Sequence, residues 1–212
     1  MAIATSLTSF MQFTGEVGPR RGRVPATLRA MYDDPTRHPW AYYGPMVSAI
    51  KAGFSTGDMS SAVGEALTVA QERALDARCR GQLKHYSQLA EGALELSRQA
   101  RVTRTFTPPS VTWTHESLTI RVSPQLGVER RHRREVWLLH LKETPLTQAT
   151  ADPALIIMTE ALETEPDLVP RVVDVRRAAV FGLAANRSRP RLAAWIRGEA
   201  ELFVRLWEEP AA

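Results

Sequence analysis

A histidine and a lysine stand two residues apart at the end of the apolar run EVWLLHLK, as His140 and Lys142. Of the 27 lysines and arginines, only those at positions 51, 84 and 142 are lysines. A GC-rich genome explains the excess of arginine over lysine. In a chain that uses arginine at almost every basic position, a lysine that faces the middle of a sheet is more readily explained by the chemistry of its amine. An amine can neutralise a phosphate, and an imidazole can bind softer divalent metals. The alternative is a surface lysine beside a hydrogen-bonded structural histidine.

A second chemical signal is the arginine run just before that apolar stretch. It comprises Arg130, Arg131, His132, Arg133 and Arg134. On a turn between strands, these side chains could contact several phosphates and make binding depend on salt. Arg176 and Arg177 are expected to extend this patch, and Asp174 is expected to pair with one of the arginines. The alternative is a solvated turn that Glu129 and Glu135 partly neutralise.

Three predicted strands must position these residues. Residues 111–115 and 118–123 alternate apolar and polar side chains around Glu116-Ser117, which indicates a hairpin. Pro124 and Gly127 then interrupt the pattern. Residues 135–143 form the third strand, which is apolar on both faces and is therefore expected at the centre of its sheet.

Helical patterns surround these strands. An apolar stripe of helical period runs from about residue 58 to 100, with Gly81 either softening one helix or dividing two. After the third strand, Asp152-Pro153 is expected to start a helix, residues 171–183 a strand or short hairpin, and residues 191–209 a last helix. The pattern predicts an α+β fold: a helical N-terminal region followed by a mixed β-sheet flanked by helices, in the order α-βββ-α-β-α.

The same pattern predicts how the chain divides. Residues 1–25 are expected to form a mobile N-terminal arm, 26–102 a helical region, and 103–212 an α/β sheet domain packed with the preceding long helix. The boundary is placed near residue 103, ahead of Pro108-Pro109. Trp40, Tyr42 and Tyr43 either offer a stacking platform for bases or anchor the arm to the helices.

From about residue 60 to 183, the order helix, three strands, helix, strand resembles the PD-(D/E)XK nuclease-like core. In that family, an acid near the start of the second strand and a carboxylate two positions before a strand lysine hold magnesium around the scissile phosphate. The resemblance implies that Lys142 is the lysine and that Glu116 is the first acid. His140 stands where the second carboxylate belongs, so the site is degenerate. Mg²⁺ or Mn²⁺ would be a cofactor only if the site were active, and otherwise none is expected.

Composition sets broader limits. A net charge of +4 and a pI of about 9.6 permit a polyanionic partner without requiring one. The one cysteine, Cys79, excludes an intramolecular disulfide and favours a reducing cytoplasm. No apolar run approaches the ~20 residues that span a bilayer, so no membrane is expected. The sequence contains no glycine-rich phosphate loop, nucleophile elbow or metalloprotease helix.

Three functions remain open on these observations. The first is a non-catalytic or weakly active protein that binds DNA or RNA through a degenerate nuclease-like core. The second is a non-enzymatic interaction module, as a subunit of a larger assembly or a homo-oligomer. The third is an active metal-dependent nuclease that uses Glu116, His140 and Lys142.

Overall fold

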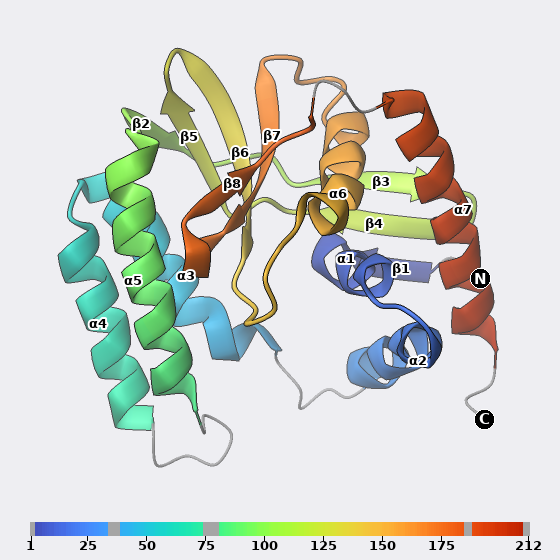
Figure 1. The fold of residues 1–212 in the computed structure, drawn as a ribbon, viewed down its shortest axis with the longest axis horizontal. Coiled ribbons are helices and arrows are strands. Elements are labelled where there is room, and N and C mark those ends of the chain that lie inside the picture. Colours follow the sequence, from blue (N-terminus) through green and yellow to red (C-terminus); the bar gives the residue numbers. More distant parts are fainter. Residues whose placement is uncertain (1–2, 34–38, 74–80, 185–187, 210–212) are drawn as a thin grey trace.

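A computed structural model describes residues 3–33, 39–73, 81–184 and 188–209 of the chain, and Cys79 lies outside these ranges. The protein is α+β, as predicted (Figure 1). The helices are α1 Leu7–Gly15, α2 Pro19–Asp33, α3 Pro39–Thr56, α4 Met59–Glu72, α5 Gln82–Ala100, α6 Gln148–Ala161, the 3₁₀ turn η3 Val175–Arg177 and α7 Arg189–Glu208. The strands are β1 Ile3–Ser6, β2 Arg104–Phe106, β3 Val111–His115, β4 Leu118–Val122, β5 Leu126–Arg130, β6 Arg133–His140, β7 Leu168–Asp174 and β8 Ala179–Phe181.

A five-stranded sheet in the order β2-β5-β6-β7-β8 forms the centre of the molecule. Strand β6 is parallel to β7, and the other neighbouring pairs are antiparallel. Helix α6 makes the crossover between the two parallel strands, as a parallel pair requires. A smaller sheet in the order β1-β4-β3 lies beside it.

Strand β6 alternates its side chains between two hydrophobic cores, as its sequence predicts. Val136 and Leu138 belong to the core that contains α1, α6, α7 and the smaller sheet. Trp137 and Leu139 belong to the core formed with α3, α4 and α5. Figure 1 shows these two groups of helices on opposite faces of the five-stranded sheet. The central position predicted for this strand is confirmed.

The prediction of a mobile arm at residues 1–25 is wrong. Strand β1 pairs in parallel with β4, with Ile3 opposite Leu118. In α1, Leu7, Phe10 and Phe13 are fully buried, and both phenylalanine rings pack edge-on against Phe203 of α7. Ser6 caps the helix by accepting a hydrogen bond from the backbone of Ser9. The N-terminal segment is therefore part of the core.

The predicted order of strands needs two corrections. The hairpin β3–β4 forms around Glu116 as expected, but it belongs to the smaller sheet and not to the sheet of β6. Strands β2 and β5 were not predicted, and both belong to the central sheet. Gly127 lies within β5 because the ring and backbone of Phe106 occupy the space that a side chain would need. That glycine marks a close approach between strands rather than a break.

The helical segments also differ in detail from the prediction. Of the two arrangements expected around Gly81, the structure has the one with two helices: Gly81, with a φ of 78°, precedes α5, and α4 is a separate helix. Helix α6 begins at Gln148 with a capping box at Thr147, and Pro153 lies inside the helix rather than at its start. No helix in the described ranges is both long enough and apolar enough to cross a lipid bilayer.

Candidate functional site

Lys142 lies in the loop that follows β6, and its amine faces α1. Its Nζ donates a hydrogen bond to Oε1 of Gln12 at 2.8 Å. Desolvation lowers the pKa of Lys142 below its usual value, and the negative charge of Glu16 partly opposes this shift. The residue is exposed as a whole, although its amine is partly desolvated. The hydrogen-bonding partner of Lys142 is thus an amide and not the carboxylate that a metal-dependent nuclease would need.

His140 is the last residue of β6 and lies opposite Asp174 in the parallel register. Its Nε2 donates to the carbonyl oxygen of Thr144 at 2.8 Å. Desolvation lowers the pKa of His140, although that carbonyl and the Asp174 charge both raise it. The imidazole is therefore neutral near pH 7, with one nitrogen already used by the loop.

The expected ion pair of Asp174 is confirmed. Its fully buried carboxylate accepts from Nη1 of Arg177 at 3.1 Å and from the backbone of Leu146 at 3.0 Å. Arg176 donates to the carbonyl of Leu141 at 3.0 Å and also contacts Gln88. Both arginines thus lie where β6 ends, next to the loop of Lys142. The prediction that they extend the arginine run at 130–134 is wrong, because that run is at the opposite end of the strand.

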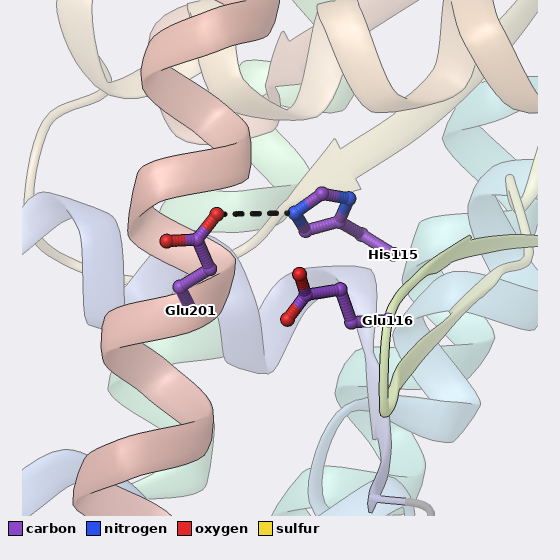
Figure 2. A group of neighbouring side chains, drawn as sticks. All are labelled: His115, Glu116 and Glu201. Atoms are coloured by element: carbon purple, nitrogen blue, oxygen red, sulfur yellow. Dashed lines mark hydrogen bonds and ion pairs between the residues drawn. The ribbon is translucent and has the colours of Figure 1, made fainter.

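Glu116 is far from the position that the resemblance assigns to it. It forms the β3–β4 turn with a φ of 49°, in the smaller sheet. Figure 2 shows its carboxylate beside the side chains of His115 and Glu201 of α7. Nε2 of His115 is 3.5 Å from Oε1 of Glu201, which makes a weak surface ion pair when the histidine is protonated. The structure therefore does not bring Glu116, His140 and Lys142 together.

The residue that precedes the second strand of the central sheet is Gln125 rather than Glu116. The Gln125 side chain accepts a hydrogen bond from the backbone of Leu139 at 2.7 Å and donates one to the carbonyl of Ser123 at 3.1 Å. Its backbone N–H bonds to the carbonyl of Trp137. Gln125 therefore joins the start of β5 to the end of β6, next to His140. Sequence analysis missed it because β5 itself was not predicted.

A cavity of about 490 Å³ opens beside Lys142 and His140. Helices α1, α2 and α3, the end of β6 and the following loop line it. Its lining includes Val47 and Leu139 from one hydrophobic core and Leu28 and Leu146 from the other. The cavity thus lies at the seam between the two cores, at the carboxyl end of the central strand.

The arginine run forms the tip of the β5–β6 hairpin, at the other end of the sheet. Arg130 pairs with Arg133, and Arg131 and His132 make the two-residue turn with φ values of 49° and 62°. Both φ values are positive, as in the turns that normally carry Asn-Gly. Figure 1 shows the turn between β5 and β6 at the top of the view, whereas the loop between β6 and α6 lies at the lower end of the sheet. The two candidate sites are separate.

Arg130 belongs to a buried ion-pair network rather than to the free surface. Its Nε donates to Oε2 of Glu135 at 2.7 Å, and Arg171 reaches Oε1 of the same carboxylate at 3.2 Å. The indole of Trp137 donates to Oε2 as well. Burial alone would raise the pKa of Glu135, but these hydrogen bonds and charges hold that pKa below its usual value. The predicted neutralisation by Glu135 is therefore real, but it is confined to Arg130 and Arg171.

The remaining arginines of the tip are exposed. Within the described ranges, Arg131 and Arg133 make no ion pair, whereas Arg134 stacks over the ring of Phe106 with its Cζ at 4.7 Å from the centroid. Arg101, the residue that follows α5, and Arg104, the first residue of the neighbouring strand β2, are also exposed. We call the following five exposed residues the basic edge: Arg101, Arg104, Arg131, Arg133 and Arg134. Sequence analysis missed Arg101 and Arg104 because β2 was not predicted.

The other side of the tip is acidic. The loop between α6 and β7 carries Glu163, Glu165 and Asp167, all exposed, and β7 begins opposite Arg134. A polyanion at the tip is therefore expected to lie over the β2 side of the hairpin.

The aromatic residues that suggested a stacking platform are used within the fold. The Tyr42 and Tyr43 rings pack edge-on at 4.8 Å, and the Tyr42 carbonyl accepts from the hydroxyl of Tyr86 at 2.6 Å. The apolar stripes of α4 and α5 are buried in the second core. The side chain of Trp40 lies outside the described residues.

Comparison with models of known protein families gives no match, and comparison with curated proteins gives none either. The function of this chain must therefore be inferred from the geometry at the two ends of its central sheet.

Proposed function

We propose that this chain is a non-catalytic nucleic-acid-binding protein that holds the phosphate backbone with the basic edge. The observation that supports this most is the hairpin tip, where Arg131 and Arg133 are exposed without an ion pair in the described part of the chain. A two-stranded β-ribbon fits the major groove of B-DNA, which is about 12 Å wide. The guanidinium groups would then contact the phosphates on the β2 side of the hairpin.

The turn itself supports a binding role. Residues with a side chain cost about 1–2 kcal/mol each in the left-handed conformation, and Asn-Gly would relieve most of that cost. The chain instead has Arg131-His132 there. Strained backbone conformations cluster at binding and active sites, where the surrounding structure holds them.

The non-catalytic part of the proposal rests on the other end of the sheet. The order α5, β2, β5, β6, α6, β7 is helix, three strands, helix, strand, with the β3–β4 hairpin inserted after the first strand. On that resemblance, the two acid positions correspond to Gln125 and His140, neither of which offers a carboxylate. A hard cation such as Mg²⁺ needs carboxylate oxygens. We therefore expect no cleavage of plasmid DNA with Mg²⁺ or Mn²⁺.

The test is a binding titration of labelled duplex DNA at low ionic strength, followed by fluorescence anisotropy. Replacing Arg131 and Arg133 together with alanine is expected to weaken binding at least about tenfold, because two phosphate contacts are lost. The matched control replaces Arg191 and Arg205, two exposed arginines of α7, and removes the same charge elsewhere. Equal losses in the two double variants would mean that only net charge matters, and no loss in the first would refute the proposal.

A further inference from the structure

The cavity beside Lys142 has the size and lining of a small-molecule site. Ligand pockets in proteins usually have volumes of about 300–1,000 Å³, and the volume of this cavity is about 490 Å³. It lies at the opposite end of the central sheet from the hairpin tip, so it is independent of the nucleic-acid proposal.

Most of the cavity wall is apolar and adaptable. Leu28 and Met31 of α2, Met11 of α1 and Val47 of α3 line it. Met11 and Met31 are half-buried, and methionine side chains change shape readily to fit a ligand. The apolar body of a ligand would be buried here, at about 0.8 kcal/mol for each methylene group.

The polar groups gather where β6 ends. Among the described residues that line the cavity, Lys142 is the one cationic side chain and Glu16 the one acidic side chain. The amine of Lys142 donates to the neutral amide of Gln12, while Arg176 and Arg177 are already engaged with Leu141 and Asp174. Lys142 can therefore exchange its amide partner for a charged oxygen.

From this arrangement we propose that the cavity binds an amphipathic carboxylate, with its apolar body between α1, α2 and α3 and its head group on the amine of Lys142. A charge-assisted hydrogen bond to a carboxylate is about twice as strong as the neutral one to Gln12 that it replaces. The nearby carboxylate of Glu16 disfavours a head group with two negative charges, such as a phosphate monoester.

The test is isothermal titration calorimetry with decanoate, decanol and decyl phosphate, each below its aggregation concentration. Decanoate is expected to bind the native chain at least tenfold more tightly than decanol and more tightly than decyl phosphate. Tighter binding of decyl phosphate would overturn the choice of a carboxylate. The absence of measurable decanoate binding would overturn the site.

Two variants locate the ligand. Lys142→Met keeps a side chain of similar length and is expected to reduce the affinity for decanoate to that for decanol. Met31 is a half-buried residue of the cavity wall, so Met31→Trp fills the cavity and is expected to weaken the binding of both decanoate and decanol. The matched control is Lys84→Met, an exposed lysine of α5 outside the cavity.

The outcomes distinguish a built site from surface adsorption. Circular dichroism melts show whether each variant is folded before it is titrated. If Lys84→Met lowered decanoate affinity as much as Lys142→Met, the ligand would be responding to charge alone and the proposal would fail. DNA binding is expected to be unchanged in Lys142→Met, so failure here leaves the nucleic-acid proposal untouched.

Discussion

At the scale of single residues, the hairpin tip and the β3–β4 turn share one strained conformation. Arg131, His132 and Glu116 all have φ values between 49° and 62°. For a residue with a β-carbon, this region costs free energy that glycine avoids. The strain at Arg131 and His132 can therefore be removed by substitution, and this separates the contribution of the turn to stability from its contribution to binding.

The combined change Arg131→Asn and His132→Gly is expected to stabilise the fold and weaken DNA binding. Relief of the strain should raise the melting temperature by about 2–4 °C for each kcal/mol in a chain of this size. Binding should fall because the Arg131 guanidinium is lost. Glu116→Gly is the control, since it relieves the same strain in the other hairpin and should leave DNA binding unchanged. A melting temperature that does not rise would contradict the strain argument.

Substitution of Glu135 tests the buried ion-pair network that it forms with Arg130 and Arg171. Glu135→Gln removes the charge that Arg130 and Arg171 share, and the loss of one partner from a buried pair costs about 3–5 kcal/mol. Urea unfolding should show that loss. Glu129→Gln is the control, because Glu129 is part-exposed and its pair with Arg134 is 4.0 Å long, so it should cost less than about 1 kcal/mol. Similar costs for the two variants would refute the assignment.

The carboxylate of Glu135 also makes the free energy of unfolding depend on pH. Because its pKa is lower in the folded state, the unfolded state binds more protons as the solution is acidified. The stability that Glu135 contributes is present above its unfolded pKa of about 4.5 and is lost as the pH falls below that value. The unfolding free energy of Glu135→Gln should therefore decline less over this range than that of the native chain.

At the scale of elements, helix α5 packs closely on the turn η3 through Gly92. A β-carbon at Gly92 would collide with the backbone carbonyl of Val175. This contact holds η3 and its two arginines against the helix, next to His85 and Gln88. The close approach of two backbones therefore fixes the loop region at the carboxyl end of the sheet.

Gly92→Ala is expected to destabilise the protein by more than about 2 kcal/mol, because overpacking of a rigid contact forces backbone shifts. Gly64→Ala on α4 is the matched control, since open space surrounds that glycine. There the change should stabilise by about 0.4–1 kcal/mol through the lower entropy of the unfolded chain. Thermal melts that shift in the same direction for both variants would contradict the packing argument.

The elements that sequence analysis recovered are those with a local pattern. Strand β6 was placed at the centre of its sheet because both of its faces are apolar, and the β3–β4 hairpin was found from its alternation. Strand β1 pairs with β4 more than a hundred residues away, so its own sequence did not reveal it. The spacing of Leu7, Phe10 and Phe13 was a readable helical signal that was missed.

In the candidate sites too, contacts between residues close in sequence were predicted, whereas contacts between distant residues were not. The pair Asp174–Arg177 spans three residues and was anticipated, whereas the contact of Lys142 with Gln12 joins residues 130 positions apart. The position of Arg101 and Arg104 beside the hairpin depends on β2, a strand of three residues. Short strands carry too little pattern to be read without the sheet that stabilises them.

At the scale of the whole molecule, one sheet separates two chemical surfaces. Strand β6 is eight residues long, which places Arg133 about 23 Å from His140 at the usual rise per residue. The basic edge lies at one end, and the cavity of Lys142 lies at the other. Helix α1 packs over the cavity end, where Gln12 contacts Lys142, so a duplex would approach the hairpin end more easily.

The salt dependence of DNA binding tests this division most directly. Each phosphate contact on B-DNA contributes about 0.9 to the slope of log affinity against log salt concentration, so the variant without Arg131 and Arg133 should lose about 1.8 from that slope. Lys142→Met should keep the native slope. A native slope in the double variant, or a reduced slope in Lys142→Met, would show that the nucleic acid binds elsewhere than the basic edge.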